Sequence, residues 1–95
     1  MKLNSDFVNG MHIINESNTI SNTFQVPVDL TKVYMLGYVF DADGDMFEFH
    51  RARSSGQIYI QRLIGSNTLT SSYDSTTQII TFTLSRTSLF FVIYF

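Results

Sequence analysis

Three acidic residues alternate in the segment D-A-D-G-D, as Asp41, Asp43 and Asp45. Close carboxylates can hold a divalent cation, and an EF-hand calcium loop requires Gly at its sixth position and Glu at its twelfth. Counted from Asp41, the fourth residue is Gly44 and the twelfth is Ala52, so this loop pattern is not met. We predict a solvated hairpin turn and no metal site, with a weak cation site of another type as the alternative.

The only histidines are His12 and His50. Acid–base catalysis needs a histidine held beside a nucleophile or a carboxylate, and no sequence motif supplies such a neighbour. Phosphate-binding loops, nucleophile elbows, zinc-ligand spacings and RNA-binding aromatic signatures are also absent from the sequence. We therefore expect structural or surface roles for both histidines, no catalytic residue, no enzymatic activity and no cofactor.

A candidate ligand face comprises Tyr34, Arg51, Arg53 and Tyr59, which fall on neighbouring predicted strands. Aromatic rings beside hydrogen-bonding groups suit glycans, and an arginine packs favourably on a tyrosine ring. The favoured alternative is a solvated strand face whose charges discourage pairing at the sheet edge.

The elements that would position these residues are β-strands. Apolar residues do not recur at helical spacing over three turns, whereas β-branched and aromatic residues are frequent and turn residues come at short intervals. We predict an all-β fold in a single domain over residues 1–95, either a small antiparallel β-sandwich or a jelly-roll-like barrel of about seven short strands. Less regular strands are expected at 6–8, 11–14, 23–26 and 68–73.

Residues 33–40 and 46–53 are predicted to form a hairpin, which 57–64 extends into a three-stranded meander. The pair Asp43-Gly44 suits a two-residue type I′ turn, in which both residues have positive φ. This turn would place Phe40 opposite Phe47. It would also gather one set of side chains on a single face: Leu36, Tyr38, Phe40, Phe47 and Phe49.

Residues 78–84 and 89–95 are predicted to form a second hairpin around Ser85-Arg86-Thr87-Ser88. One face of this hairpin would pack in the core, with Phe82 opposite Phe91. The other face of the last, almost wholly apolar strand would then need a partner. We predict a subunit interface that consists of Ile79, Phe90, Val92 and Tyr94.

The composition limits the classes of partner. Charged residues are 15% of the chain, against roughly a quarter in an average protein, and 44% of the residues are hydrophobic. A domain of 95 residues has few interior positions for them, which favours assembly. The net charge of −2 lacks the basic excess of proteins that bind nucleic acid.

The remaining sequence signals concern location. The absence of cysteine fits the cytosol. The sequence shows neither a secretory signal nor an apolar run long enough to span a bilayer, so we expect no membrane insertion. From the initial Met we expect a complete small reading frame.

The Ser/Thr/Asn-rich, weakly charged meander that closes on an aromatic strand, in Tyr34–Ile64 and Gln78–Phe95, resembles small bacteriophage virion proteins. These are tips of tail or head fibres, decoration proteins and baseplate accessory subunits. The resemblance implies a β-sandwich or jelly-roll-like fold that trimerises or binds a larger virion protein, and in tip domains a host glycan. It also implies a place in the virion, after assembly in the host cytoplasm.

We therefore predict a non-enzymatic virion structural or adhesion module. It would form a homo-oligomer, with a trimer favoured, or dock on a larger virion protein. The terminal strand and the aromatic face around Tyr38, Phe40 and Phe47 would make the contacts. One alternative is a small intracellular phage-encoded inhibitor of a host enzyme, and another is a carbohydrate-binding module that uses Tyr34, Tyr59 and the nearby arginines.

Overall fold

The computed structural model describes residues 11–14, 20–29, 34–52 and 57–95. This part of the chain forms seven antiparallel strands and no helix, so the all-β prediction with about seven strands is confirmed. The strands are β1 (His12–Ile14), β2 (Ile20–Pro27), β3 (Tyr34–Asp41), β4 (Met46–Ala52), β5 (Ile58–Ile64), β6 (Leu69–Asp74) and β7 (Ile79–Tyr94).

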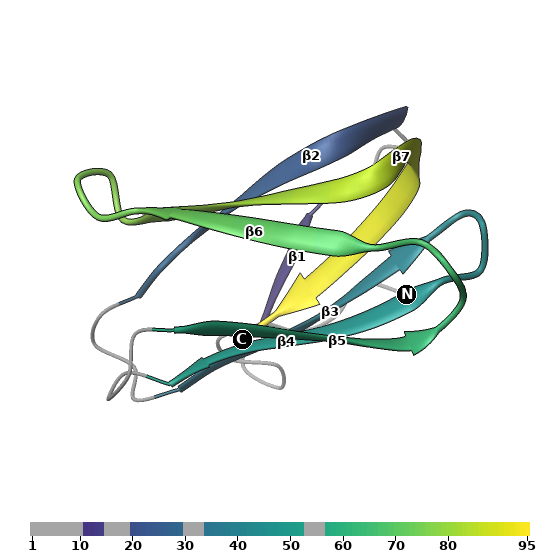
Figure 1. The fold of residues 1–95 in the computed structure, drawn as a ribbon. Helices are drawn as coiled ribbons and strands as arrows, with labels where there is room; N and C mark the ends of the chain where they lie inside the picture. Colours follow the sequence, from purple (N-terminus) through teal and green to yellow (C-terminus); the bar gives the residue numbers. More distant parts are fainter. Residues whose placement is uncertain (1–10, 15–19, 30–33, 53–56) are drawn as a thin grey trace.

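Two sheets share the long strand β7. Its first half pairs with β2 and β6, which makes a three-stranded sheet. Its second half lies between β1 and β3, and β4 and β5 extend this five-stranded sheet in the order β1-β7-β3-β4-β5. The two sheets form the upper and lower layers of Figure 1, and β7 turns from one into the other. This architecture is consistent with the predicted small β-sandwich.

The chain does not reverse at Ser85-Arg86-Thr87-Ser88, so the predicted terminal hairpin is wrong. These four residues include no Gly, Pro, Asn or Asp, which tight turns favour. The strand bends there and continues. On β2, the pairing therefore jumps between Ser21, opposite Ser88, and Thr23, opposite Thr83. Such a bend is a common way for one strand to pass between two packed sheets.

Side chains along β7 alternate without a break from one sheet to the other. Apart from the exposed bend, the even positions are buried: Ile80, Phe82, Leu84, Ser88, Phe90, Val92 and Tyr94. Successive side chains of a strand point to opposite faces. The even positions therefore face the core between the sheets, and the odd positions face away from it.

The β3–β4 hairpin forms as predicted, but its register differs by one residue because Phe40 pairs with Met46. The loop contains three residues, Ala42-Asp43-Gly44. The N–H of Gly44 donates to the carbonyl oxygen of Asp41 over 3.2 Å, and Gly44 has a φ of 89°. A type I turn followed by a left-handed glycine closes a three-residue loop of this kind.

A register shift of one residue exchanges the faces of a strand relative to its neighbour. Phe47 and Phe49 lie in the core, where they are 1% and 0% exposed. Tyr38 and Phe40 lie on the other side of the sheet. The predicted aromatic face is therefore wrong, because its members divide between the core and the surface.

The other predicted strands are found where the structure describes them. The meander continues from β4 into β5, β1 occupies 12–14, and β2 contains the predicted strand 23–26 and ends at the single proline, Pro27. The strand expected near 68–73 is β6, which pairs with the first half of β7. The strand expected at 6–8 lies outside the described residues.

The core fills the space between the two sheets. A group of stacked and tilted phenylalanine rings lies at its centre: Phe82 is 5.0 Å from Phe24 and 4.6 Å from Phe49, measured between ring centroids. Aliphatic residues from both sheets surround these rings, and the fully buried ones are Val26, Val39, Ile80 and Val92. Within the described residues, no helix is long and apolar enough to cross a membrane.

Candidate assembly surface

Three of the four residues predicted to form the interface lie in the chain's own core. Phe90, Val92 and Tyr94 are 8%, 0% and 9% exposed. The fourth, Ile79, is half-buried at the start of β7, where it pairs with Pro27 and Asp74. The prediction that side chains point outward is wrong for Phe90, Val92 and Tyr94, because the even positions of β7 face the core.

The apolar side chains of the last strand that do face outward are at the odd positions. We call the side of the five-stranded sheet that faces away from the three-stranded sheet the outer face. Phe91 and Ile93 lie on it beside Phe40 and Tyr38 of β3, with which they pair. Phe95 continues the row, because its backbone N–H and C=O bond to Leu36.

Large apolar side chains on the outer face remain exposed. Phe40 and Phe91 are each 36% exposed, and their ring centroids are 6.4 Å apart. Phe95 is 40% exposed. An exposed, contiguous apolar surface on a small domain is typical of an interaction site.

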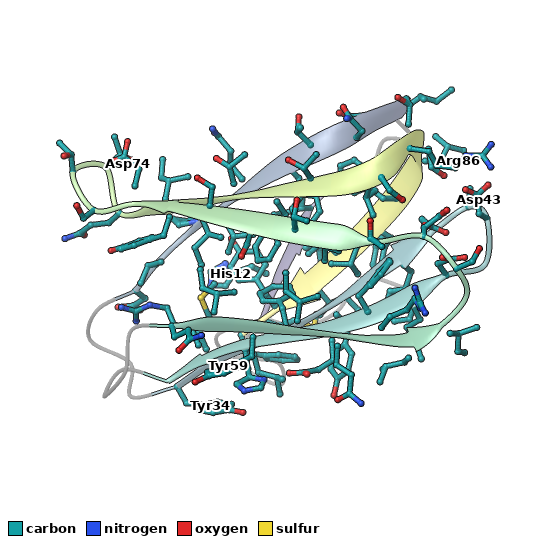
Figure 2. All side chains as sticks on the ribbon, in the orientation of Figure 1. His12, Tyr34, Asp43, Tyr59, Asp74 and Arg86 are labelled. Atoms are coloured by element: carbon teal, nitrogen blue, oxygen red, sulfur yellow. The ribbon has the colours of Figure 1, made fainter. Side chains whose placement is uncertain are left out.

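One end of the outer face carries a row of three rings from three strands. Tyr34 of β3, His50 of β4 and Tyr59 of β5 stack, with centroid distances of 5.9 Å and 5.1 Å between neighbours. His50 Nδ1 lies 2.8 Å from Glu48 Oε1. Figure 2 shows Tyr34 and Tyr59 on the same side of the sheet. A ligand between two of these rings would need a contact of about 3.5 Å to each of them, and the distances between neighbouring rings are shorter than that sum. Only the outer surfaces of the two tyrosines are therefore free.

Arg51 does not belong to the predicted ligand face. It follows His50 and therefore points inward, where it is 9% exposed and its guanidinium carbon lies 5.7 Å from the ring centroid of Tyr73. Its Nε has no hydrogen-bond partner. Arg53 lies outside the described residues. The prediction is wrong for Arg51, whereas Tyr34 and Tyr59 do share a face.

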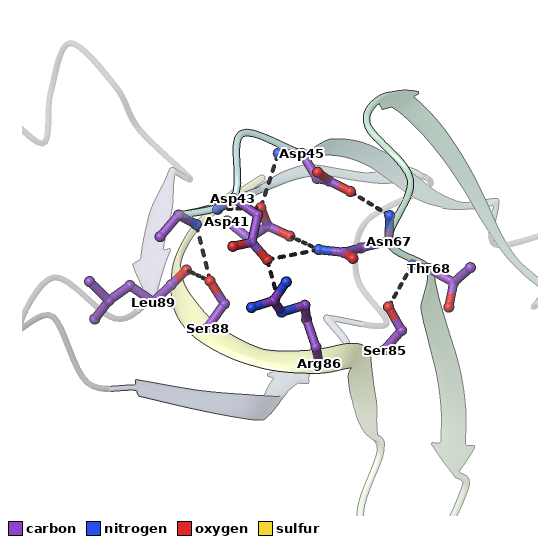
Figure 3. Close-up of polar contacts among 10 residues, drawn as sticks. Asp41, Asp43, Asp45, Asn67, Thr68, Ser85, Arg86, Ser88 and Leu89 are labelled. Atoms are coloured by element: carbon purple, nitrogen blue, oxygen red, sulfur yellow. Dashed lines mark hydrogen bonds and ion pairs between the residues drawn. The ribbon is translucent and has the colours of Figure 1, made fainter.

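Asp41 organises the acidic turn. Its Oδ1 accepts hydrogen bonds from the backbone N–H groups of Asp43 and Asp45, both over 3.0 Å. Its Oδ2 accepts the side-chain amide of Asn67 over 3.2 Å. The turn is therefore bonded to the loop between β5 and β6, as Figure 3 shows.

The other two carboxylates complete what we call the Asp41 clasp: Asp41, Asp43, Asp45, Asn67 and Arg86. Asp45 accepts the backbone N–H of Asn67 over 2.6 Å, and Asp43 accepts its side-chain amide over 3.0 Å. Arg86, at the bend of β7, places its Nε 3.3 Å from Asp43. The clasp thus joins three chain segments that are far apart in sequence.

Two further features hold the same region together. The backbone N–H of Ala42 donates to Ser88 Oγ and to the carbonyl oxygen of Leu89, over 3.2 Å and 2.8 Å. Gly65 has a φ of 103°, and a Cβ at this position would overlap the carboxylate of Asp45. Glycine is therefore required beside the clasp.

The described side chains show no arrangement that performs a recognisable reaction. The carboxylates of the Asp41 clasp accept hydrogen bonds from N–H groups. Within the described residues, no group of three His, Cys, Asp or Glu could hold a metal ion. His12 stacks on Tyr94 with centroids 4.9 Å apart. Neither histidine bonds to a hydroxyl nucleophile of the described part of the chain.

Burial raises the pKa of the Tyr94 phenol above its ordinary value of 10.0. The folded state therefore favours the neutral phenol, and this contribution to stability is fully present below pH 10. It is lost as the pH rises through the raised pKa, because the unfolded chain releases the proton first. We expect urea unfolding to show a decline in stability as the pH rises above 10, and Tyr94→Phe to reduce this decline; an unchanged pH profile in the variant would contradict this.

The sequence offered a signal for the outer face but not for the clasp. Odd positions 89, 91, 93 and 95 of the last strand are all apolar, as are even positions 90, 92 and 94, so both faces were candidates for a contact with another chain. The clasp depends on Asn67 and Arg86, whose residue types alone indicate no pairing with Asp43. Comparisons with protein-family models, curated proteins and solved structures found no match.

Proposed function

We propose that this protein is a non-enzymatic structural module that self-associates through the outer face of its five-stranded sheet. The observation that carries the proposal is the exposed apolar surface formed by β3 and β7. The contact proposed from the sequence thus moves to the opposite side of the terminal strand, from Phe90, Val92 and Tyr94 to Phe91, Ile93 and Phe95.

The extent of this surface supports a contact with another protein chain. The large exposed side chains of the outer face and its margin are Tyr34, Phe40, Tyr59, Ile64, Phe91 and Phe95. At their exposed fractions they offer roughly 500 Å², given about 200 Å² for a whole aromatic side chain. Half-buried Leu36, Tyr38 and Ile93 add to this area. A standard interface buries about 800 Å² on each partner.

The charges on this face favour a second copy of the chain as the partner. Glu48 is the one acidic residue among its strand positions from β3, β4 and β7, and it already contacts His50. Two such faces can therefore meet with few charged groups in the contact, and the carboxylate that each brings is already hydrogen-bonded to His50. In keeping with the sequence resemblance, we propose that the assembled module is a component of a phage virion.

The mass of the purified protein in solution tests self-association. We expect size-exclusion chromatography with light scattering to give an oligomer, and Phe40→Lys to lower its mass by placing a charge in the contact. Ser72→Lys is the matched control, since Ser72 is exposed on β6, in the three-stranded sheet, and lies away from the outer face. A monomeric wild type at high micromolar concentration would refute the proposal.

Mass spectrometry of purified phage particles tests the proposed location in the virion. Abundance of the chain in the particles supports the virion component, whereas co-purification with a soluble host enzyme supports the alternative of an inhibitor. A glycan array tests the carbohydrate-binding alternative. Tyr34→Ala should abolish any glycan signal that depends on the row of rings.

A further inference from the structure

Strand β5 forms an edge of the five-stranded sheet. The order β1-β7-β3-β4-β5 ends at β5, and no strand of the described residues pairs with its second side. Five of its seven residues are exposed. Figure 1 shows β5 at the margin of the lower layer. Its outward backbone N–H and C=O groups are thus available to another strand.

The first half of this edge, residues 58–61, lacks the features by which proteins usually prevent pairing between molecules. Protected edges are short, carry proline or lysine, or have a bulge that breaks the ladder. The sequence of β5, I-Y-I-Q-R-L-I, contains no Pro, Gly or Lys. Its one charge, Arg62, lies where the register shifts, and donates to the carbonyl oxygens of Ser66 and Asn67 over 3.4 Å and 3.3 Å.

Two of the other edge strands are protected in these ways, and the third, β6, is polar. β1 has only three residues, and β2 contains a register shift and ends in Pro27. β6 carries polar Thr70, Ser71 and Ser72 at its centre. The contrast singles out β5, in which Ile58 and Ile60 pack against the core on one side and Tyr59 lies in the row of rings on the other.

We infer that β5 pairs with β5 of a second copy, antiparallel and about a two-fold axis beside the central residues Tyr59, Ile60 and Gln61. Antiparallel backbone ladders are self-complementary under such an axis, so the same surface serves both partners. The two five-stranded sheets become one continuous sheet. This inference rests on the proposed function, since it names a second contact by which the module assembles.

The pairing also extends the outer face. A two-fold axis of this kind places the outer faces of both copies on the same side of the continuous sheet, and the row of Tyr34, His50 and Tyr59 meets its counterpart. A paired edge and a stacked outer face are each two-fold contacts. Assembly through both therefore gives even numbers of chains, a dimer or a tetramer, in place of the trimer expected from the sequence.

Disulfide trapping in the full-length chain tests the inference, because the protein has no cysteine of its own. Antiparallel pairing brings opposed Cα atoms within about 5.5 Å, which a disulfide can bridge. We expect at least one of Tyr59→Cys, Ile60→Cys and Gln61→Cys to form covalent dimers under mild oxidation, about tenfold above the control. The control is Ser72→Cys, at the centre of β6. The inference is overturned if none of the three exceeds this control.

The same variants separate this inference from the proposed function. Trapping at β5 that persists in a Phe40→Lys background shows that the edge contact is independent of the outer face. If the β5 cysteines form covalent dimers and the mass of Phe40→Lys equals that of the wild type, the edge contact is supported and the outer-face contact is refuted. A mass that falls in Phe40→Lys, with no trapping at β5, supports the outer face and refutes the edge. A wild-type trimer in solution contradicts the two-fold pairing.

Discussion

Val92→Lys is expected to unfold the protein. Val92 is fully buried, lies on the core side of β7 and pairs with both Ile14 and Val39. Lysine there would place an unpaired ammonium group between the sheets and remove apolar contacts, at a cost of about 5 kcal/mol or more. This is a large share of the roughly 5–15 kcal/mol that stabilises a typical domain. Circular dichroism and urea titration of the purified variant measure it.

Phe91→Lys is the matched control for this experiment. Phe91 is the neighbour of Val92 on the same strand, is 36% exposed and faces outward. A lysine there keeps its charge out of the core, so the free energy of unfolding of the single chain should change by about 2 kcal/mol or less. The opposite ranking, with Phe91→Lys the more destabilised variant, would show that the strand turns its other face to the core.

Asp41→Ala is expected to lower the free energy of unfolding by about 3 kcal/mol. The Asp41 side chain accepts from two backbone N–H groups in its own turn and from Asn67, and it is 9% exposed. Without the carboxylate, the buried N–H of Asp45 loses its acceptor, and the link between the turn and the β5–β6 loop weakens. Urea unfolding with the slope held common to both proteins gives the difference.

Asp43→Ala provides the comparison, since it removes one charge from the same clasp. The Asp43 side chain is partly exposed, and its ion pair with Arg86 lies in solvent, so we expect a loss of less than about 1 kcal/mol. Equal losses for the two variants would show that general electrostatics of the acidic turn, rather than the bonds made by Asp41, stabilise this region.

Local pattern was sufficient to predict the element types and most of the positions. Alternation of apolar and polar residues predicts strands because side-chain direction alternates within each strand, independently of its partners. The hairpin at Asp43-Gly44 was also predictable, because Gly44 supplies the positive φ that its turn needs. The length of that turn was not, since a loop of two or three residues accepts the same Asp-Gly pair.

The register of the hairpin depended on the tertiary structure. A loop of two residues and a loop of three residues give registers that differ by one position, and the local sequence does not choose between them. In the observed three-residue loop, the Asp41 side chain accepts hydrogen bonds from the N–H groups of Asp43 and Asp45 and from the side chain of Asn67. Asn67 comes from another part of the chain. No local pattern near residue 41 indicates it.

The sequence by itself determined that this protein is a small all-β domain with an excess of apolar strand residues, since composition and alternation are local properties. Only the tertiary structure decided which side of the last strand is buried. In the second half of β7 both sides are apolar, so local hydrophobicity does not choose between Val92 and Phe91. The choice follows from the bend at 85–87, which carries the strand from one sheet to the other and keeps its even positions between them. The outer face, with Phe91 and Phe95, is the consequence.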